Sequence, residues 1–184
     1  MATKNTRSDA AVAVDQTAAE AVEAKSEPTK ISAKEIDVNQ YVPVKNGFNG
    51  ILVYKSKHTG ETYIWEELGD EQEIELIELK RAKSSSKRFF VDNWFMFDDD
   101  YMWVVDYLGM SKYYKNAIRM EDLDEVLQKS EKELKEIVPG LSSGQKKTMA
   151  YRARQMIADG EIDSLGAIKT LQELLGVDLI EQQF

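Results

Sequence analysis

Residues 51–65 read ILVYKSKHTGETYIW and decide the fold of the region around them. They hold two runs rich in β-branched and aromatic residues, Ile51–Ser56 and Glu61–Glu66, on either side of a turn that contains Gly60. Such runs around a glycine turn are typical of a β-hairpin. Because a two-stranded hairpin is marginally stable alone, we expect it to pack on a third strand at Tyr41–Val44 and on the helices that follow.

The hydrophobic period changes after the hairpin. Apolar residues spaced three and four apart predict a helix from Asp70 to about Lys83, with Asp70 and Glu73 as its capping pair. The same spacing and its stop signals predict further helices at Tyr101–Leu108, Asp122–Lys129, Glu131–Val138, Ser142–Asp159 and from Asp163 or Ser164 to Leu175. The last two are expected to form a helical hairpin.

These patterns predict an α+β fold: a small antiparallel β-hairpin or three-stranded sheet packed on helices, followed by a C-terminal helical hairpin. We divide the chain into an N-terminal arm (1–35), an α+β body (36–119) and a helical subdomain (120–184). The arm is predicted to be flexible, because its Ala, Thr, Ser, Glu and Lys residues cannot bury enough apolar surface to offset the entropy of ordering. An arm that orders on a neighbouring subunit is the alternative.

Composition limits the classes of function. The 184-residue chain carries a net charge of −9, has no cysteine, and shows no apolar run of the length that a secretory signal or a membrane span needs. We therefore expect a soluble cytoplasmic protein without disulfides and without membrane contact. The negative charge disfavours general binding to phosphate backbones, although a local basic patch could still act.

No catalytic set is evident in the sequence. His58 is the only histidine and lies in the hairpin turn, so neither a zinc site nor a histidine triad can be assembled from one chain. The run Asp98–Asp100 could in principle hold a divalent cation, but acidic residues at a helix start are favoured electrostatically, and we assign it a capping role. A glycine-rich phosphate loop of the P-loop type is missing. The sequence predicts a non-enzymatic protein without cofactor or metal.

Two kinds of segment are candidates for partner contact. The aromatic segment 89–97 is expected to form much of the core and also part of a contact surface, and the basic residues between Lys80 and Arg88 lead directly into it. A second group of basic residues lies on the helix before Gly160, which is either structural or a docking surface for an acidic partner. The predicted partner-binding residues are Phe89, Phe90, Trp94, Phe95, Lys146, Lys147, Arg152 and Arg154.

Several longer stretches resemble a family of small proteins of tailed bacteriophages. They are YVPVKNGF (41–48), the hairpin with its TGE turn and Trp65, DNWFMF (92–97), and the C-terminal part from GQKK (144–147) through DGEIDS (159–164) to Leu175-Gly176. The resemblance covers about residues 36–181 and carries no catalytic motif. It implies a phage setting, in the host cytoplasm during assembly and in the virion.

Together, these features predict a non-enzymatic virion or assembly protein that docks onto other phage structural or assembly proteins. The protein itself can be a monomer or an oligomer. The alternative is a phage-encoded adaptor that associates with nucleic acid or regulates transcription, for which the two basic stretches are the motivation. Weak contact with nucleic acid is compatible with either reading.

Overall fold

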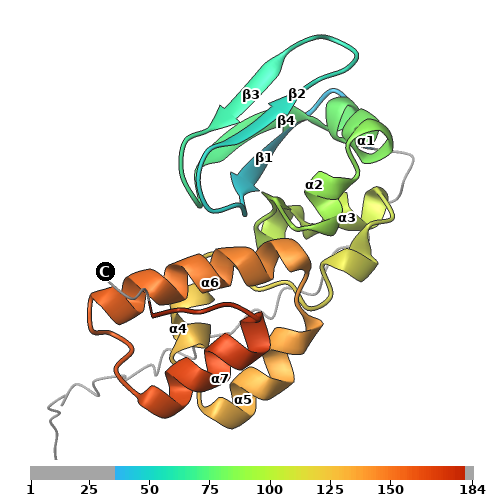
Figure 1. Cartoon of the computed structure of the whole chain (residues 1–184). Helices are drawn as coiled ribbons and strands as arrows, with labels where there is room; N and C mark the ends of the chain where they lie inside the picture. The colour runs from blue at the N-terminus through green and yellow to red at the C-terminus, as the bar shows by residue number, and fades with distance from the viewer. Residues whose placement is uncertain (1–35, 181–184) are drawn as a thin grey trace, which may run out of the picture. The chain divides into compact units, whose positions relative to one another are not determined.

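The structure is a computed structural model that describes residues 36–180. It confirms the predicted α+β class: the strands within residues 41–75 lie together, and the helices within residues 123–175 form a separate group (Figure 1). The predicted arm, residues 1–35, lies outside the described residues.

The strands form two small antiparallel sheets. Their bounds are β1 (Tyr41–Asn46), β2 (Leu52–Lys55), β3 (Thr62–Trp65), β4 (Glu71–Glu75) and β5 (Phe95–Met96). β2 and β3 make the predicted hairpin, in which Val53 lies opposite Ile64. The predicted third strand exists as β1, but it does not pair with the hairpin. It lies instead at the centre of a sheet of order β4-β1-β5, and it touches the hairpin through the Trp65 indole, which donates a hydrogen bond to the Val44 carbonyl (2.8 Å).

The predicted helix from Asp70 to Lys83 is wrong in its first half. Residues Glu71–Glu75 form β4, and the helix α1 begins only at Leu76. The reason is a long-range partner: β1 offers a complete ladder, and Ile74 pairs with Val42 on the buried side of the sheet. Tertiary pairing of this kind overrides the helical preference of glutamate and glutamine. Asp70 caps no helix; its carboxylate accepts from two backbone N–H groups of the preceding turn.

The five helices predicted beyond residue 100 lie close to their predicted positions, whereas the short helix at Arg88–Val91 and the three 3-10 helices of the described residues were not predicted. The helix bounds are α1 (Leu76–Ser85), α2 (Arg88–Val91), η1 (Asp99–Tyr101), α3 (Met102–Tyr107), η2 (Ser111–Tyr113), α4 (Leu123–Leu127), α5 (Glu131–Ile137), η3 (Val138–Gly140), α6 (Ser143–Ala158) and α7 (Leu165–Leu175). The hydroxyl groups of Ser142 and Ser164 cap α6 and α7, and Gly176 ends α7 with a φ of 68°. That left-handed conformation favours glycine.

Two hydrophobic clusters stabilise the fold. The first joins β1, the hairpin, α1, α3 and the aromatic segment, and it includes Trp65, Phe90 and Phe95 among its fully buried side chains. The second joins α4–α7 and includes Leu134, Met149 and Leu171. The domain boundary at residue 119 stays a prediction.

Asp92 and the start of α6 connect the two clusters. The Asp92 carboxylate accepts hydrogen bonds from Arg88 (2.7 Å) and from the Ser143 hydroxyl (2.9 Å), and its carbonyl accepts from the Ser142 hydroxyl (3.1 Å). Gly144 faces the same residue so closely that an added Cβ would lie 2.0 Å from the Asp92 carbonyl oxygen. An aspartate beside the first turn of a helix also interacts favourably with the helix dipole.

Two further buried side chains of α6 complete this connection. The Gln145 amide accepts from the Ile118 N–H (3.2 Å) and donates to the Ile118 carbonyl (2.6 Å). The Thr148 hydroxyl donates to the Gly47 carbonyl (2.9 Å) in the turn after β1. The Thr148 bond fixes α6 against the β1–β2 turn, and the Gln145 bonds fix it against residue 118, so the surface between α6 and the turn has a defined shape.

Candidate functional site

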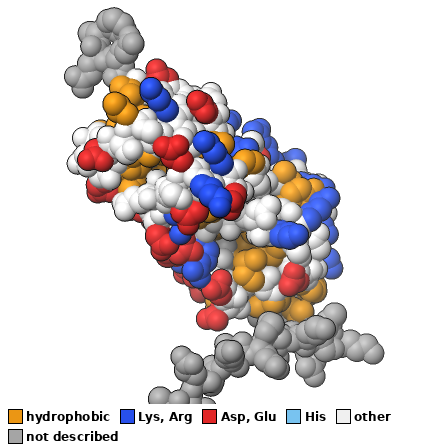
Figure 2. Space-filling view, turned by 90° about the horizontal axis from the view of Figure 1, so that it is seen from below, with side chains coloured by type: hydrophobic (Ala, Val, Ile, Leu, Met, Phe, Trp, Pro, Cys, Tyr) orange, Lys and Arg blue, Asp and Glu red, His pale blue; other side chains and the backbone are white. Residues whose placement is uncertain are grey.

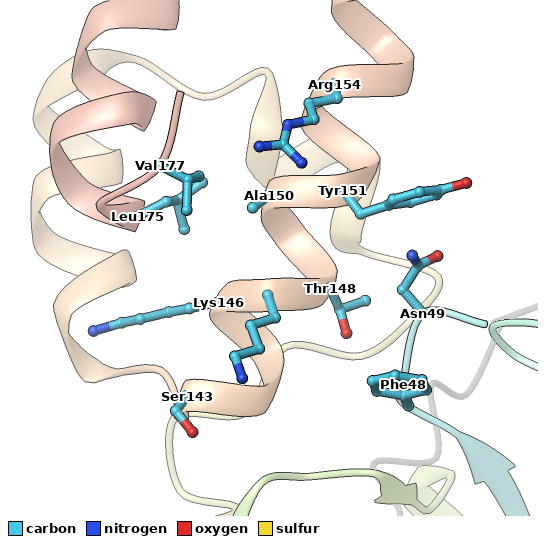
Figure 3. A pocket seen from close by; sticks show the side chains of 11 residues that line it. Phe48, Asn49, Ser143, Lys146, Thr148, Ala150, Tyr151, Arg154, Leu175 and Val177 are labelled. Atoms are coloured by element: carbon cyan, nitrogen blue, oxygen red, sulfur yellow. The ribbon is translucent and has the colours of Figure 1, made fainter. Parts of the chain in front are cut away.

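A groove of about 520 Å³ lies along α6. We call it the α6 groove; it is lined by Phe48, Asn49, Ser143, Lys146, Lys147, Thr148, Ala150, Tyr151, Arg154, Leu175 and Val177. Figure 3 shows Leu175 and Val177 on one side of α6, and Phe48 and Asn49 on the other. The groove therefore uses α6 as its floor, the end of α7 as one bank and the β1–β2 turn as the other.

Most of the α6 residues of the groove lie on one stripe of the helix, and Thr148 lies outside it. The stripe contains residues at intervals of four, three and four: Ser143, Lys147, Ala150 and Arg154. Tyr151 lies one turn after Lys147 on the same side. Residues spaced in this way lie on one face of a helix. The stripe covers eleven residue steps, or roughly 16 Å at 1.5 Å per residue. The floor is long enough for a short segment of another chain.

The groove combines aliphatic surface, mainly on the α7 bank, with positively charged side chains. Ala150, Leu175 and Val177 supply aliphatic surface, and Tyr151 is 44 % exposed although it is a large aromatic residue. In the space-filling view of Figure 2, hydrophobic side chains reach the surface between Lys and Arg side chains in several places.

The three cations of the groove are Lys146, Lys147 and Arg154. Lys146 donates a long hydrogen bond to the Pro139 carbonyl (3.4 Å), and the Arg154 guanidinium donates to the Asp178 carbonyl (2.7 Å). None of the three forms an ion pair with a carboxylate of residues 36–180. In a chain with a net charge of −9, three cations without a carboxylate partner in the described region make this groove a site of local positive charge.

Arg152 does not line this groove, and its contact with a partner stays a prediction. Its guanidinium binds the Asp124 carboxylate of α4 with two hydrogen bonds (2.7 and 2.6 Å). Residues two positions apart on a helix lie about 200° apart around its axis, so Arg152 and Arg154 point to different sides. The hydrogen bonds from Arg152 lower the pKa of Asp124 below its ordinary value.

This pair leads to a prediction about stability and pH. Because the pKa of Asp124 is lowered in the folded state, the pair stabilises the fold above about pH 4, and the stabilisation is lost as the pH falls through the lowered pKa. Both side chains are partly exposed, so we expect Arg152→Ala to lower the free energy of unfolding at pH 7 by only about 0.5–1 kcal/mol. Urea unfolding at pH 7 and at pH 2 should show a difference between wild type and variant at pH 7 that disappears at pH 2. An equal difference at both pH values would contradict the assignment.

The structure places Phe90 and Phe95 in the core, which corrects their prediction as partner contacts. Both side chains are fully buried, and the ring of Phe95 packs against those of Phe90, Tyr54 and Trp65. A ring enclosed in this way can reach no other chain. For Phe89, which is half-buried, partner contact stays a prediction.

Trp94 connects the aromatic segment to the α6 groove. Its ring packs edge-on against Phe48 at the end of the groove (5.7 Å between centroids), and the Arg88 guanidinium lies over it at 5.0 Å. Arg88 also forms an ion pair with Asp92. The first basic stretch is therefore partly engaged within the fold, while Trp94 lies beside a surface that a partner could use.

The acidic run Asp98–Asp100 has a different role from the predicted one. Asp98 lies at the start of η1, but its side chain makes no capping hydrogen bond and instead accepts from the Lys45 ammonium (2.7 Å), which also donates to Glu121 (2.8 Å). These bonds raise the pKa of Lys45 and lower that of Glu121. Asp99 pairs with Arg119 (2.8 Å). Within residues 36–180, no group of three or more potential ligands is placed to hold a metal ion.

The sequence reasoning missed the apolar part of the groove. Phe48 and Tyr151 carry a signal that could have been used, since Phe48 follows the Asn46-Gly47 turn and Tyr151 interrupts the polar side of a basic helix. The predicted helical hairpin already placed the end of α7 beside α6, but the sequence did not show that Leu175 and Val177 would line a groove with the β1–β2 turn.

In the part of the chain that the structure describes, no helix has the length and apolar character to span a bilayer. Comparisons of the chain with protein-family models, with curated proteins and with solved structures found no match.

Proposed function

We propose that this protein is a non-enzymatic interaction protein that docks onto a partner protein through the α6 groove. The observation that carries the proposal is the combination of an aliphatic lining, mainly on the α7 bank, with Lys146, Lys147 and Arg154, none of which pairs with a described carboxylate. Exposed apolar surface rimmed by polar groups is typical of sites of protein contact. The groove also lies on rigid elements, since α6 is fixed by Gln145 and Thr148.

We further propose that the partner belongs to a tailed bacteriophage and that the protein acts in its virion or during its assembly. The support for this setting is the resemblance of residues 36–181 to small phage proteins. Mass spectrometry of purified particles and of assembly intermediates tests it: we expect the protein in at least one of these fractions. Its absence from both would refute the setting while leaving the docking function open.

The docking proposal predicts the effect of reversing charge in the groove. We expect the double substitution of Lys146 and Lys147 by glutamate to weaken association with the partner by about tenfold or more, since each reversal replaces an attraction by a repulsion. Lys147 is exposed and Lys146 makes only one long hydrogen bond, so the fold should be unaffected.

The matched control reverses two exposed lysines of α5, Lys132 and Lys135, which changes the net charge equally. Co-purification of the tagged protein at a fixed salt concentration measures both variants. If the α5 variant weakened association as much as the groove variant, net charge alone would explain the effect and the groove would not be the docking site.

Single-stranded nucleic acid is the second candidate for the same groove. The groove places cations beside the aromatic rings of Phe48 and Tyr151. Proteins that bind single strands use cations to contact the phosphates and aromatic rings to stack on the bases. Binding of an oligonucleotide that falls steeply with salt, and that the Lys146 and Lys147 reversal abolishes, would favour this candidate. Absence of binding at low salt would exclude it.

A further inference from the structure

We propose that the occupant of the α6 groove is an acidic amphipathic helix of the partner protein. This inference rests on the docking function proposed above and adds the chemistry of the bound segment. The groove meets three requirements of such a segment: an elongated floor, aliphatic surface along it, and cations at defined intervals.

The first step is the match of shape and length. The lining residues of α6 recur at intervals of three and four, so the floor presents the ridges and grooves of a helix surface. Two helices pack against each other through such surfaces, and an apolar helix face laid into a groove is a common mode of peptide recognition. A floor of roughly 16 Å corresponds to about three turns of a bound helix.

The second step is the match of charge. Lys147 and Arg154 lie seven residues apart on α6, which separates their positions by roughly 10 Å along the axis. On a bound helix that runs beside α6, carboxylates seven residues apart would have the same separation. Ala150 lies between the two cations and is small, so an aliphatic side chain of the bound helix can approach the floor there.

The third step distinguishes a peptide from nucleic acid. The aliphatic lining comes from Ala150 on the floor and from Leu175 and Val177 on the α7 bank, and such side chains provide no stacking platform for bases. Of the two groove aromatics, Phe48 already packs its ring against Trp94. Only Tyr151 remains as an exposed ring of the groove. A single ring can form one anchor contact with a bound helix, whereas a nucleic-acid strand would need several rings for a row of stacked bases.

Site-specific photo-cross-linking in the cells that produce the protein tests the inference. The full chain carries p-benzoylphenylalanine at position 151, where the native tyrosine is exposed, and a control chain carries it at the exposed position 132 on α5. We expect a cross-link from position 151 that position 132 does not give. Peptide mapping should place it in a segment with excess Asp and Glu and with apolar residues at helical spacing.

A synthetic peptide of the mapped segment then allows the affinity for the groove to be measured. We expect fluorescence anisotropy to show at least about tenfold weaker binding to the Lys147→Glu chain than to wild type, and unchanged binding to the Lys132→Glu chain. A cross-linked protein segment without acidic excess or helical spacing would overturn this inference and leave the docking function standing. A cross-link to nucleic acid, or none from position 151, would overturn both.

Discussion

Replacing Phe95 by alanine is expected to lower the free energy of unfolding by about 3–5 kcal/mol, the range for removal of a large aromatic side chain from a packed core. The ring is fully buried and packs against four others, those of Tyr54, Trp65, Phe89 and Phe90. Its loss therefore removes apolar burial and leaves a cavity that β5 and α2 cannot close without repacking. Urea unfolding followed by tryptophan fluorescence measures the change.

Tyr151→Ala is the matched control, because it also removes an aromatic ring but from a position that is 44 % exposed. We expect it to change the free energy of unfolding by no more than about 0.5 kcal/mol, as is usual at the surface. Association with the partner should fall instead. The opposite result, a stable Phe95→Ala and a destabilised Tyr151→Ala, would mean that core and contact surface have been assigned the wrong way round.

The fold and the position of Phe95 show which features could be predicted from the sequence and which could not. Alternation and glycine turns were sufficient for the hairpin, and serine caps with glycine stops were sufficient for the ends of α6 and α7. These signals are local: they depend on residues close together in the sequence, so the rest of the fold does not change their outcome. The aromatic segment was recognised as core, but composition alone does not separate the rings that face inward from those that face outward.

The errors share a physical cause, which is dependence on distant parts of the chain. β4 is a strand because β1 pairs with it, although its own residues favour a helix. The ion pair of Arg152 with Asp124 of α4 likewise joins distant parts of the chain, so the sequence does not show it. The groove itself needs α6, the end of α7 and the β1–β2 turn together, so only its cations were visible in the sequence.

Gly144 is the second residue whose replacement should have a large effect. An alanine Cβ there would lie 2.0 Å from the Asp92 carbonyl oxygen and 2.8 Å from the Asp92 Cβ, well inside van der Waals contact. Asp92 cannot move away easily, because Arg88, Ser142 and Ser143 all hold it. Overpacking of this kind costs about 1–3 kcal/mol and occasionally more. We expect Gly144→Ala to lower the free energy of unfolding by about 2–3 kcal/mol, even though alanine is the better helix former.

Gly166→Ala provides a matched control, since Gly144 and Gly166 are each the second residue of their helix. At position 166 the only close approach of the added Cβ would be to the end of the exposed Glu131 side chain, which can rotate away; the Ser164 hydroxyl lies at an ordinary contact distance of 3.8 Å. Alanine there should leave the stability unchanged or raise it by up to about 1 kcal/mol through helix propensity. Urea unfolding of both variants separates the two effects. If Gly144→Ala were as stable as Gly166→Ala, the close approach of α6 to Asp92 would not exist, and the groove would lose the contact that holds its floor in place.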